Sequence, residues 1–185
     1  MDIDLGKLES QVRAAIAKSM FVETEVLEFL SKDEWFLVRR NVATNLTATA
    51  TILDSLSKDE DLYVKVGVAK NPSTSGKTLD FLSRDENAEV KFEVAGNEST
   101  LSETLAHLAT NKHPIIKRSV AINKNTSPET LALLGKERDV GIKYFVAHNP
   151  NTPEEVRENL PKGTWATIPT VEQLYAYYAD NDDWY

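Results

Sequence analysis

The segment that decides the fold is VRRNVATN, residues 38–45, because closely similar segments recur along the chain. Six of these segments, each 26 residues after the one before, begin at Val12, Val38, Val64, Val90, Ile116 and Ile142. Valine at the first position, with valine and alanine four and five positions later, forms one apolar helix face. A fixed period of this length is typical of a stacked repeat array. We call this predicted helix the B helix of its repeat.

A second set of apolar residues follows the same period. We use the word column for residues at equivalent positions of successive repeats. One leucine column holds Leu27, Leu53, Leu79, Leu105 and Leu131, and another holds Leu30, Leu56, Leu82, Leu108, Leu134 and Leu160. Leucines three residues apart form one face of a second short helix, the A helix. Each helix is too short to be stable alone, so the repeats must stack on one another.

The residues at the helix ends predict how each helix begins and stops. Capping-box spacing is found in the pairs Thr100 with Glu103, Thr126 with Glu129 and Thr152 with Glu155. An asparagine column ends the B helices at Asn45, Asn71, Asn97, Asn123 and Asn149. Asparagine tolerates the left-handed backbone conformation that often stops a helix, so we expect that conformation there.

These columns resemble the HEAT-like superfamily, and within it the leucine-rich repeat variant type. The resemblance rests on the pattern valine–basic–x–x–valine–alanine–x–asparagine, followed by a leucine helix that begins at a threonine. It covers residues 12–160. The resemblance implies an all-α fold, a right-handed α-solenoid of about six 26-residue two-helix repeats. One member type binds an iron–sulfur cluster through cysteines, and this chain has no cysteine. We expect no cofactor and no metal.

The repeat pattern also predicts the domain organisation. Residues 1–160 form the array, and an opening helix over residues 4–18 serves as an N-terminal cap. Residues 161–185 leave the repeat and form a capping helix with an acidic, aromatic tail, DNDDWY. That tail is either a cap for the last repeat or a docking segment.

Composition bounds the possible partners. The net charge is −8, which disfavours nucleic-acid binding, because that binding depends on cations that neutralise phosphates. No apolar segment approaches the length of a membrane span, and no signal peptide precedes the array. We therefore expect a cytoplasmic protein that binds another protein, with no small-molecule substrate evident.

Two polar columns look functional but have structural alternatives. A basic column runs through Arg13, Arg39, Lys65, Lys91, Lys117 and Lys143. Most of its members follow an acidic residue by six positions, so we expect an acid–base ladder between repeats rather than a phosphate-binding rail. Lys117 follows the neutral Asn111, so we expect Lys117 to be freer to bind a ligand. The asparagine column could bind a peptide backbone, but turn formation is the favoured alternative.

The candidate binding surface lies where the repeats differ from one another. Two and six positions after the start of each B-helix segment, the residue type changes from repeat to repeat, and such positions are open to recognition. Arginine and aromatic side chains are common interface anchors. The predicted partner-binding residues are Arg40, Lys70, Phe92, Lys117, Arg118, Tyr144, His148, Trp184 and Tyr185. The alternative is that some of these aromatic side chains fill space between repeats.

Nothing in the sequence predicts catalysis. The three histidines, His107, His113 and His148, do not form a metal-ligand pair, and no phosphate-binding loop is present. HEAT-like DNA glycosylases are the one enzyme class to consider, and their site residues cannot be assigned here. The leading hypothesis is a non-catalytic protein-interaction scaffold. The alternatives are a nucleic-acid-interacting module using the basic rail, and an acidic nucleic-acid mimic that inhibits a basic enzyme.

Overall fold

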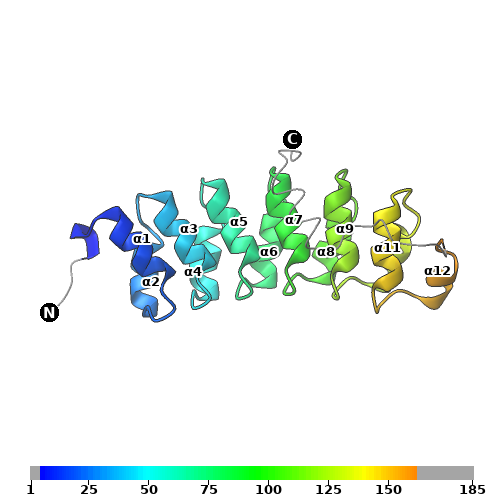
Figure 1. Cartoon of the computed structure of the whole chain (residues 1–185), viewed down its shortest axis with the longest axis horizontal. Coiled ribbons are helices and arrows are strands. Elements are labelled where there is room, and N and C mark those ends of the chain that lie inside the picture. Colours follow the sequence, from blue (N-terminus) through cyan, green and yellow to red (C-terminus); the bar gives the residue numbers. More distant parts are fainter. Residues whose placement is uncertain (1–4, 162–185) are drawn as a thin grey trace. The chain divides into compact units, whose positions relative to one another are not determined.

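The computed structural model describes residues 5–161, and the chain divides into two compact units, residues 1–82 and 83–185. All regular structure within the described residues is helical (Figure 1). Unit 1 contains η1 (Leu5–Lys7), α1 (Ser10–Lys18), α2 (Thr24–Leu30), α3 (Phe36–Thr44), α4 (Ala50–Leu56), α5 (Leu62–Lys70) and α6 (Gly76–Leu82). Unit 2 contains α7 (Ala88–Gly96), α8 (Ser102–Leu108), α9 (Pro114–Ile122), α10 (Pro128–Leu134), α11 (Val140–His148) and α12 (Glu154–Glu158).

The helices alternate between the two predicted kinds. The B helices are α1, α3, α5, α7, α9 and α11, and each has nine residues. The A helices from α2 to α10 have seven residues each, and α12 has five. Within unit 1, α3 packs between α1 and α5, and within unit 2, α9 packs between α7 and α11. The predicted repeat array of two-helix units is confirmed, while its right-handed sense stays a prediction.

The core consists of the predicted apolar columns. The leucine columns of the A helices are almost completely buried, as are the valine and isoleucine positions from Val38 to Ile142. An alanine column also runs along the B helices. Five of its members have no exposed surface: Ala17, Ala43, Ala69, Ala95 and Ala121. A methyl side chain at this position lets neighbouring B helices approach closely, which explains why alanine recurs there.

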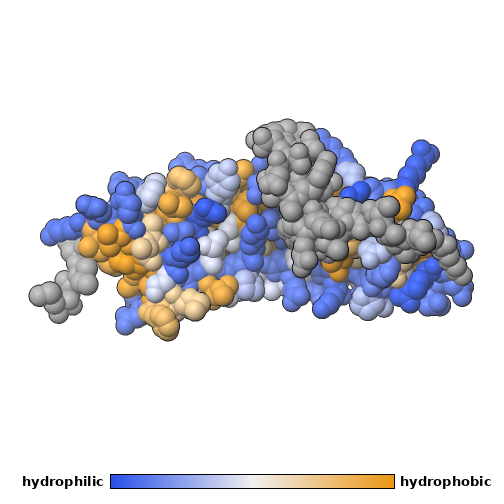
Figure 2. All heavy atoms as spheres, in the orientation of Figure 1, coloured by the Kyte–Doolittle hydropathy of each residue, from blue (hydrophilic) through white to orange (hydrophobic). Residues whose placement is uncertain are grey.

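The N-terminal end of unit 1 departs from the prediction. The helix expected over residues 4–18 is two pieces, η1 and α1, and α1 takes the regular place of a B helix against α3. Val12 is 44% exposed, whereas Val38 and Val64 in the same column are fully buried. Nothing in residues 5–82 covers Val12 as a preceding repeat would. Figure 2 shows hydrophobic surface over this part of unit 1, where Met20 and Phe21 are also exposed.

The ends of the helices correct two sequence predictions. The threonines expected to form capping boxes instead point backwards: the Thr100, Thr126 and Thr152 hydroxyls donate to the Val94, Val120 and Val146 carbonyls at 2.5–2.6 Å. The asparagines at the ends of the B helices are extended, with φ near −70°, and no non-glycine residue described here has a positive φ. The prediction of a left-handed backbone conformation at these asparagines is therefore wrong.

Candidate protein-binding surface

The asparagine column connects successive repeats. The Asn123 Nδ2 atom donates to the Ala95 carbonyl at 2.8 Å and to the Asn97 carbonyl at 2.9 Å, both in the preceding repeat. The Asn123 Oδ1 atom accepts the Asn125 amide at 2.9 Å, which forms the turn. Asn45, Asn71 and Asn149 make the same contacts in their own units. The predicted turn role is confirmed, and these buried amide donors are already used within the protein.

The basic column also joins repeats, through a register that the sequence did not reveal. The Arg39 guanidinium binds the Asp59 carboxylate through two hydrogen bonds of 2.7 and 2.9 Å. A third donor of Arg39 reaches the Asp33 carbonyl at 2.8 Å. For Arg13, Arg39 and Lys117 the carboxylate partner thus lies 20 residues after the base. At Arg39, the acid six residues before it contributes a backbone oxygen. The ladder exists, with its carboxylates assigned differently from the prediction.

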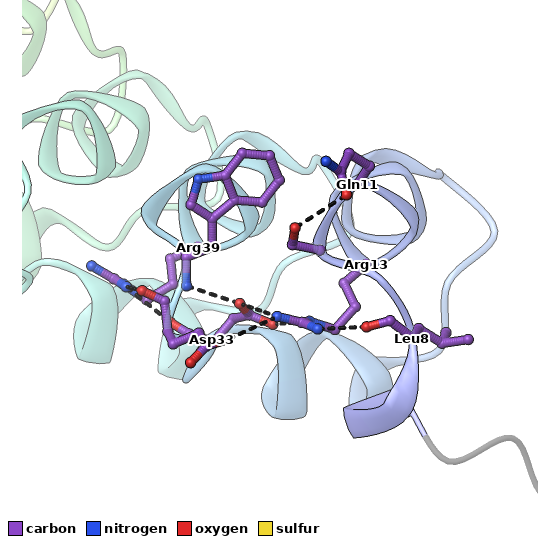
Figure 3. A network of polar contacts seen from close by, with 8 residues as sticks. Leu8, Gln11, Arg13, Asp33 and Arg39 are labelled. Carbon is purple, nitrogen blue, oxygen red and sulfur yellow. Dashed lines mark hydrogen bonds and ion pairs between the residues drawn. The ribbon is translucent and has the colours of Figure 1, made fainter.

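The first rung of the ladder is drawn in Figure 3. The Arg13 guanidinium lies between the Leu8 carbonyl, 2.6 Å away, and the Asp33 carboxylate, which it binds at 2.5 and 3.1 Å. Asp33 also accepts the Trp35 amide at 2.9 Å. Burial raises the pKa of Asp33. The hydrogen bonds that its carboxylate accepts from Arg13 and the Trp35 amide lower the pKa by more than burial raises it. The net pKa therefore lies below the ordinary aspartate value.

Lys117 is not free, contrary to the sequence prediction. Its Nζ atom lies 2.5 Å from the Glu137 carboxylate, and its side chain is 17% exposed. The prediction failed because it paired Lys117 with Asn111, six residues earlier, whereas the carboxylate lies 20 residues later. By the same register, Asn111 is the counterpart of Lys91. The neutral rung is therefore at Lys91 rather than at Lys117.

The variable positions of unit 1 bring Arg40 and Tyr63 together. The Arg40 guanidinium carbon lies 6.0 Å from the centre of the Tyr63 ring, within cation–π range. Arg40 is exposed, and Tyr63 is 54% exposed. Lys70 is exposed as well. Tyr63 was missed from sequence because it precedes the valine segment by one position, and only positions after the segment start were considered.

The positions of Arg40 and Tyr63 have counterparts on neighbouring B helices of unit 2, where the contact is different. Arg118 holds the position of Arg40, and its guanidinium binds the Asp139 carboxylate at 2.7 and 3.2 Å. Gly141 holds the position of Tyr63, and a Cβ atom there would lie 2.9 Å from Arg118 Nε. Glycine therefore leaves room for Arg118 to reach Asp139. Burial raises the pKa of Asp139, but hydrogen bonds from Arg118 and the Ile142 amide bring it below the ordinary value.

Tyr144 and His148 form an aromatic pair at the end of unit 2. Their ring centres are 4.2 Å apart, and the His148 Nδ1 atom lies 2.8 Å from the Tyr144 carbonyl. His148 is exposed and Tyr144 is half-buried. Phe92, by contrast, is 4% exposed, so the space-filling alternative describes it better than a role as an exposed anchor. Trp184 and Tyr185 lie outside the described residues, as does the predicted capping helix over residues 161–185 beyond Pro161.

The described residues offer little for other chemistry. Within residues 5–161, no group of three or more histidine, aspartate or glutamate side chains is arranged to hold a metal ion. No helix in the same range combines the length and apolar character needed to cross a lipid bilayer. The remaining feature is the exposed set of arginine, aromatic and histidine side chains, which suits contact with another macromolecule.

Comparison with known proteins yields a match at the level of structure. No protein-family model and no curated protein matches the chain. A solved structure described as a leucine-rich repeat variant with a novel repetitive structural motif aligns with a TM-score of 0.63 and 23% identity. The alignment covers 91% of this chain and 64% of that one, so the present chain spans just under two thirds of the solved protein. The chain therefore has the all-helical repeat fold of a leucine-rich repeat variant, as its recurring columns predict.

Proposed function

We propose that this protein is a non-catalytic interaction scaffold that binds another protein through the variable positions of its B helices. The observation that carries the proposal is the Arg40–Tyr63 pair, in which an exposed cation lies over an exposed aromatic ring. The two side chains lie on the neighbouring helices α3 and α5, outside the alanine, asparagine and basic columns that recur in the repeats. Arginine and tyrosine are enriched among residues that dominate interface energies. We expect the partner to be cytoplasmic.

The Tyr144–His148 pair provides the corresponding surface in unit 2. Both side chains occupy positions that change from repeat to repeat, and their rings are already ordered against each other. Ordered aromatic side chains lose little conformational freedom on binding, which favours affinity. Arg118 on the neighbouring helix α9 is held by Asp139, so it presents a fixed rather than a freely moving guanidinium.

The proposal is tested by capturing partners from the native host with the wild-type chain and with Arg40→Ala/Tyr63→Ala. The matched control is Lys32→Ala/Phe81→Ala, which removes an exposed cation and an aromatic ring, 52% exposed, from elsewhere in unit 1. We expect the first double variant, and not the control, to lose at least one partner. Equal capture by both variants, or equal loss, would overturn the proposal for unit 1.

The unit 2 surface is tested in the same experiment with His148→Ala and its control His107→Ala. Both histidines are exposed, but His107 belongs to an A helix and lies outside the variable B-helix positions. A partner lost with both variants, or with neither, would argue against a specific role for α11.

Of the alternatives, the nucleic-acid module has less support. Its rail would need free cations, yet Arg13, Arg39 and Lys117 are paired with carboxylates. A paired cation contributes less to the neutralisation of phosphates. The acidic-mimic alternative depends on the DNDDWY tail, which lies outside the described residues.

A further inference from the structure

The first two repeats of unit 2 each offer the next repeat four backbone carbonyls. The first repeat of the unit presents the carbonyls of Ala95, Asn97, Glu98 and Thr100. Asn123 Nδ2 donates to the first two, at 2.8 and 2.9 Å, and Asn125 Nδ2 donates to the last two, at 2.6 and 3.2 Å. Two asparagine side chains, separated by one residue, therefore bind four backbone carbonyls of the preceding repeat.

The second repeat of the unit is joined to the third in the same way. Asn149 Nδ2 donates to the carbonyls of Ala121 and Asn123 at 2.8 and 3.0 Å. Asn151 Nδ2 donates to the carbonyls of Lys124 and Thr126 at 2.6 and 3.1 Å. The same asparagine-to-carbonyl hydrogen bonds thus occur at two successive junctions of unit 2.

The last described repeat has the corresponding carbonyls, and Arg157 donates to three of the four. Arg157 Nε donates to the Ala147 carbonyl at 3.2 Å. Arg157 Nη2 donates to the carbonyls of Asn149 and Thr152 at 3.2 and 3.3 Å. The third nitrogen, Nη1, binds the Glu154 carboxylate at 3.2 Å, which keeps the guanidinium in place.

The position of Arg157 in the repeat supports a special role. It lies 26 residues after Leu131, in a column whose other members, Leu27 to Leu131, are all fully buried leucines. A guanidinium has five N–H donors in a planar fork, which suits several carbonyls at once. A cation is also favourable at the C-terminus of α11, where the last carbonyls carry partial negative charge.

We infer that Arg157 is an end cap that replaces a following repeat and closes the stacking surface of α11 to a further copy of the chain. The register position of the next asparagine holds Tyr175, 26 residues after Asn149, which has no side-chain amide. The other end of the chain lacks the donor too, because Ser19 stands 26 residues before Asn45. Head-to-tail contacts between repeat arrays would otherwise generate open filaments, which this arrangement opposes.

The test uses full-length Arg157→Leu, which restores the residue typical of its column but removes the donors. We expect backbone amide exchange over residues 147–152 to rise at least tenfold, because the loop loses its side-chain contacts. The equivalent loop over residues 121–126 is held by Asn149 and Asn151, so its exchange should not change. Arg157→Lys, which keeps the charge but not the fork, should give an intermediate increase. Exchange within twofold of wild type over residues 147–152 in Arg157→Leu would overturn the inference.

A second measurement asks whether the cap controls assembly. Ser19→Asn restores the missing donor on a backbone that is already extended like that of Asn45. We expect the mass of Ser19→Asn in solution to equal that of wild type, because Arg157 still blocks the acceptors. The double variant Ser19→Asn/Arg157→Leu should show a mass that increases with concentration, measured by sedimentation equilibrium. A double variant with the mass of wild type at every concentration would show that Arg157 does not bar stacking.

Discussion

Replacing Asn123 with alanine should destabilise the protein by about 3–4 kcal/mol. Asn123 is 7% exposed and makes three hydrogen bonds, two as donor to the preceding repeat and one as acceptor from its own turn. Each such bond contributes about 1 kcal/mol net. The variant also leaves the Ala95 carbonyl, at the C-terminal end of α7, without its side-chain donor in a buried place, which adds about 1 kcal/mol or slightly less.

The measurement is urea denaturation followed by far-ultraviolet circular dichroism, with the free energy of unfolding obtained by linear extrapolation. The control is Lys124→Ala, the exposed neighbouring residue in the same loop, which should change the free energy by less than about 0.5 kcal/mol. Asn123→Asp should cost at least as much as Asn123→Ala, because a carboxylate would face two carbonyl oxygens. A loss below about 1 kcal/mol for Asn123→Ala would refute the argument that this column holds the repeats together.

Three further predictions concern other columns. Asp59→Asn should lower the free energy of unfolding at pH 7 by about 2 kcal/mol. Since the pKa of Asp59 in the folded state is lowered, despite its burial, by Arg39 and a backbone amide, that stability is present above the pKa of the unfolded state. It is lost as the pH falls through the folded pKa, so the difference between variant and wild type should shrink in acid titrations. Leu131→Ala, at a fully buried position, should cost about 2–5 kcal/mol in thermal or urea denaturation. Leu133→Ala, in the same helix but 49% exposed, should cost much less, and similar values for the two would contradict the assigned helix face. Thr126→Val removes a buried hydroxyl that donates at 2.6 Å to a carbonyl of α9 and should cost about 1–2 kcal/mol, while Thr126→Ser should retain most of the stability.

The fold was predictable from the sequence because each column carries one simple physical property. Leucine, valine and alanine recur at helical spacing, and the same residue types occupy the same positions in successive repeats. A wrong assignment in one repeat would therefore conflict with the pattern of the others. The asparagine column was correctly assigned to the turns. Its contacts across repeats were not predicted, because they depend on where the preceding helix ends in space.

The features that sequence reasoning missed involve distances that a linear pattern does not contain. The basic ladder has its carboxylates 20 residues ahead, whereas the six-residue spacing is equally regular along the chain. The threonine hydroxyls had two possible directions, towards the next helix or back to the previous one, with the same spacing. Tyr63 becomes part of the candidate surface only because the preceding B helix brings Arg40 over its ring.

The paired asparagines of unit 2 also bear on how such a gene can change in length. The two junctions described there use the same donors on one side and the same acceptors on the other. Recombination that removes or duplicates a block of 26 codons therefore joins two surfaces that already fit. A deletion of any other length would place a donor opposite the wrong atom and leave a carbonyl buried without a partner. Selection acting on these hydrogen bonds can thus preserve the period of the repeat while the residues at the surface diverge.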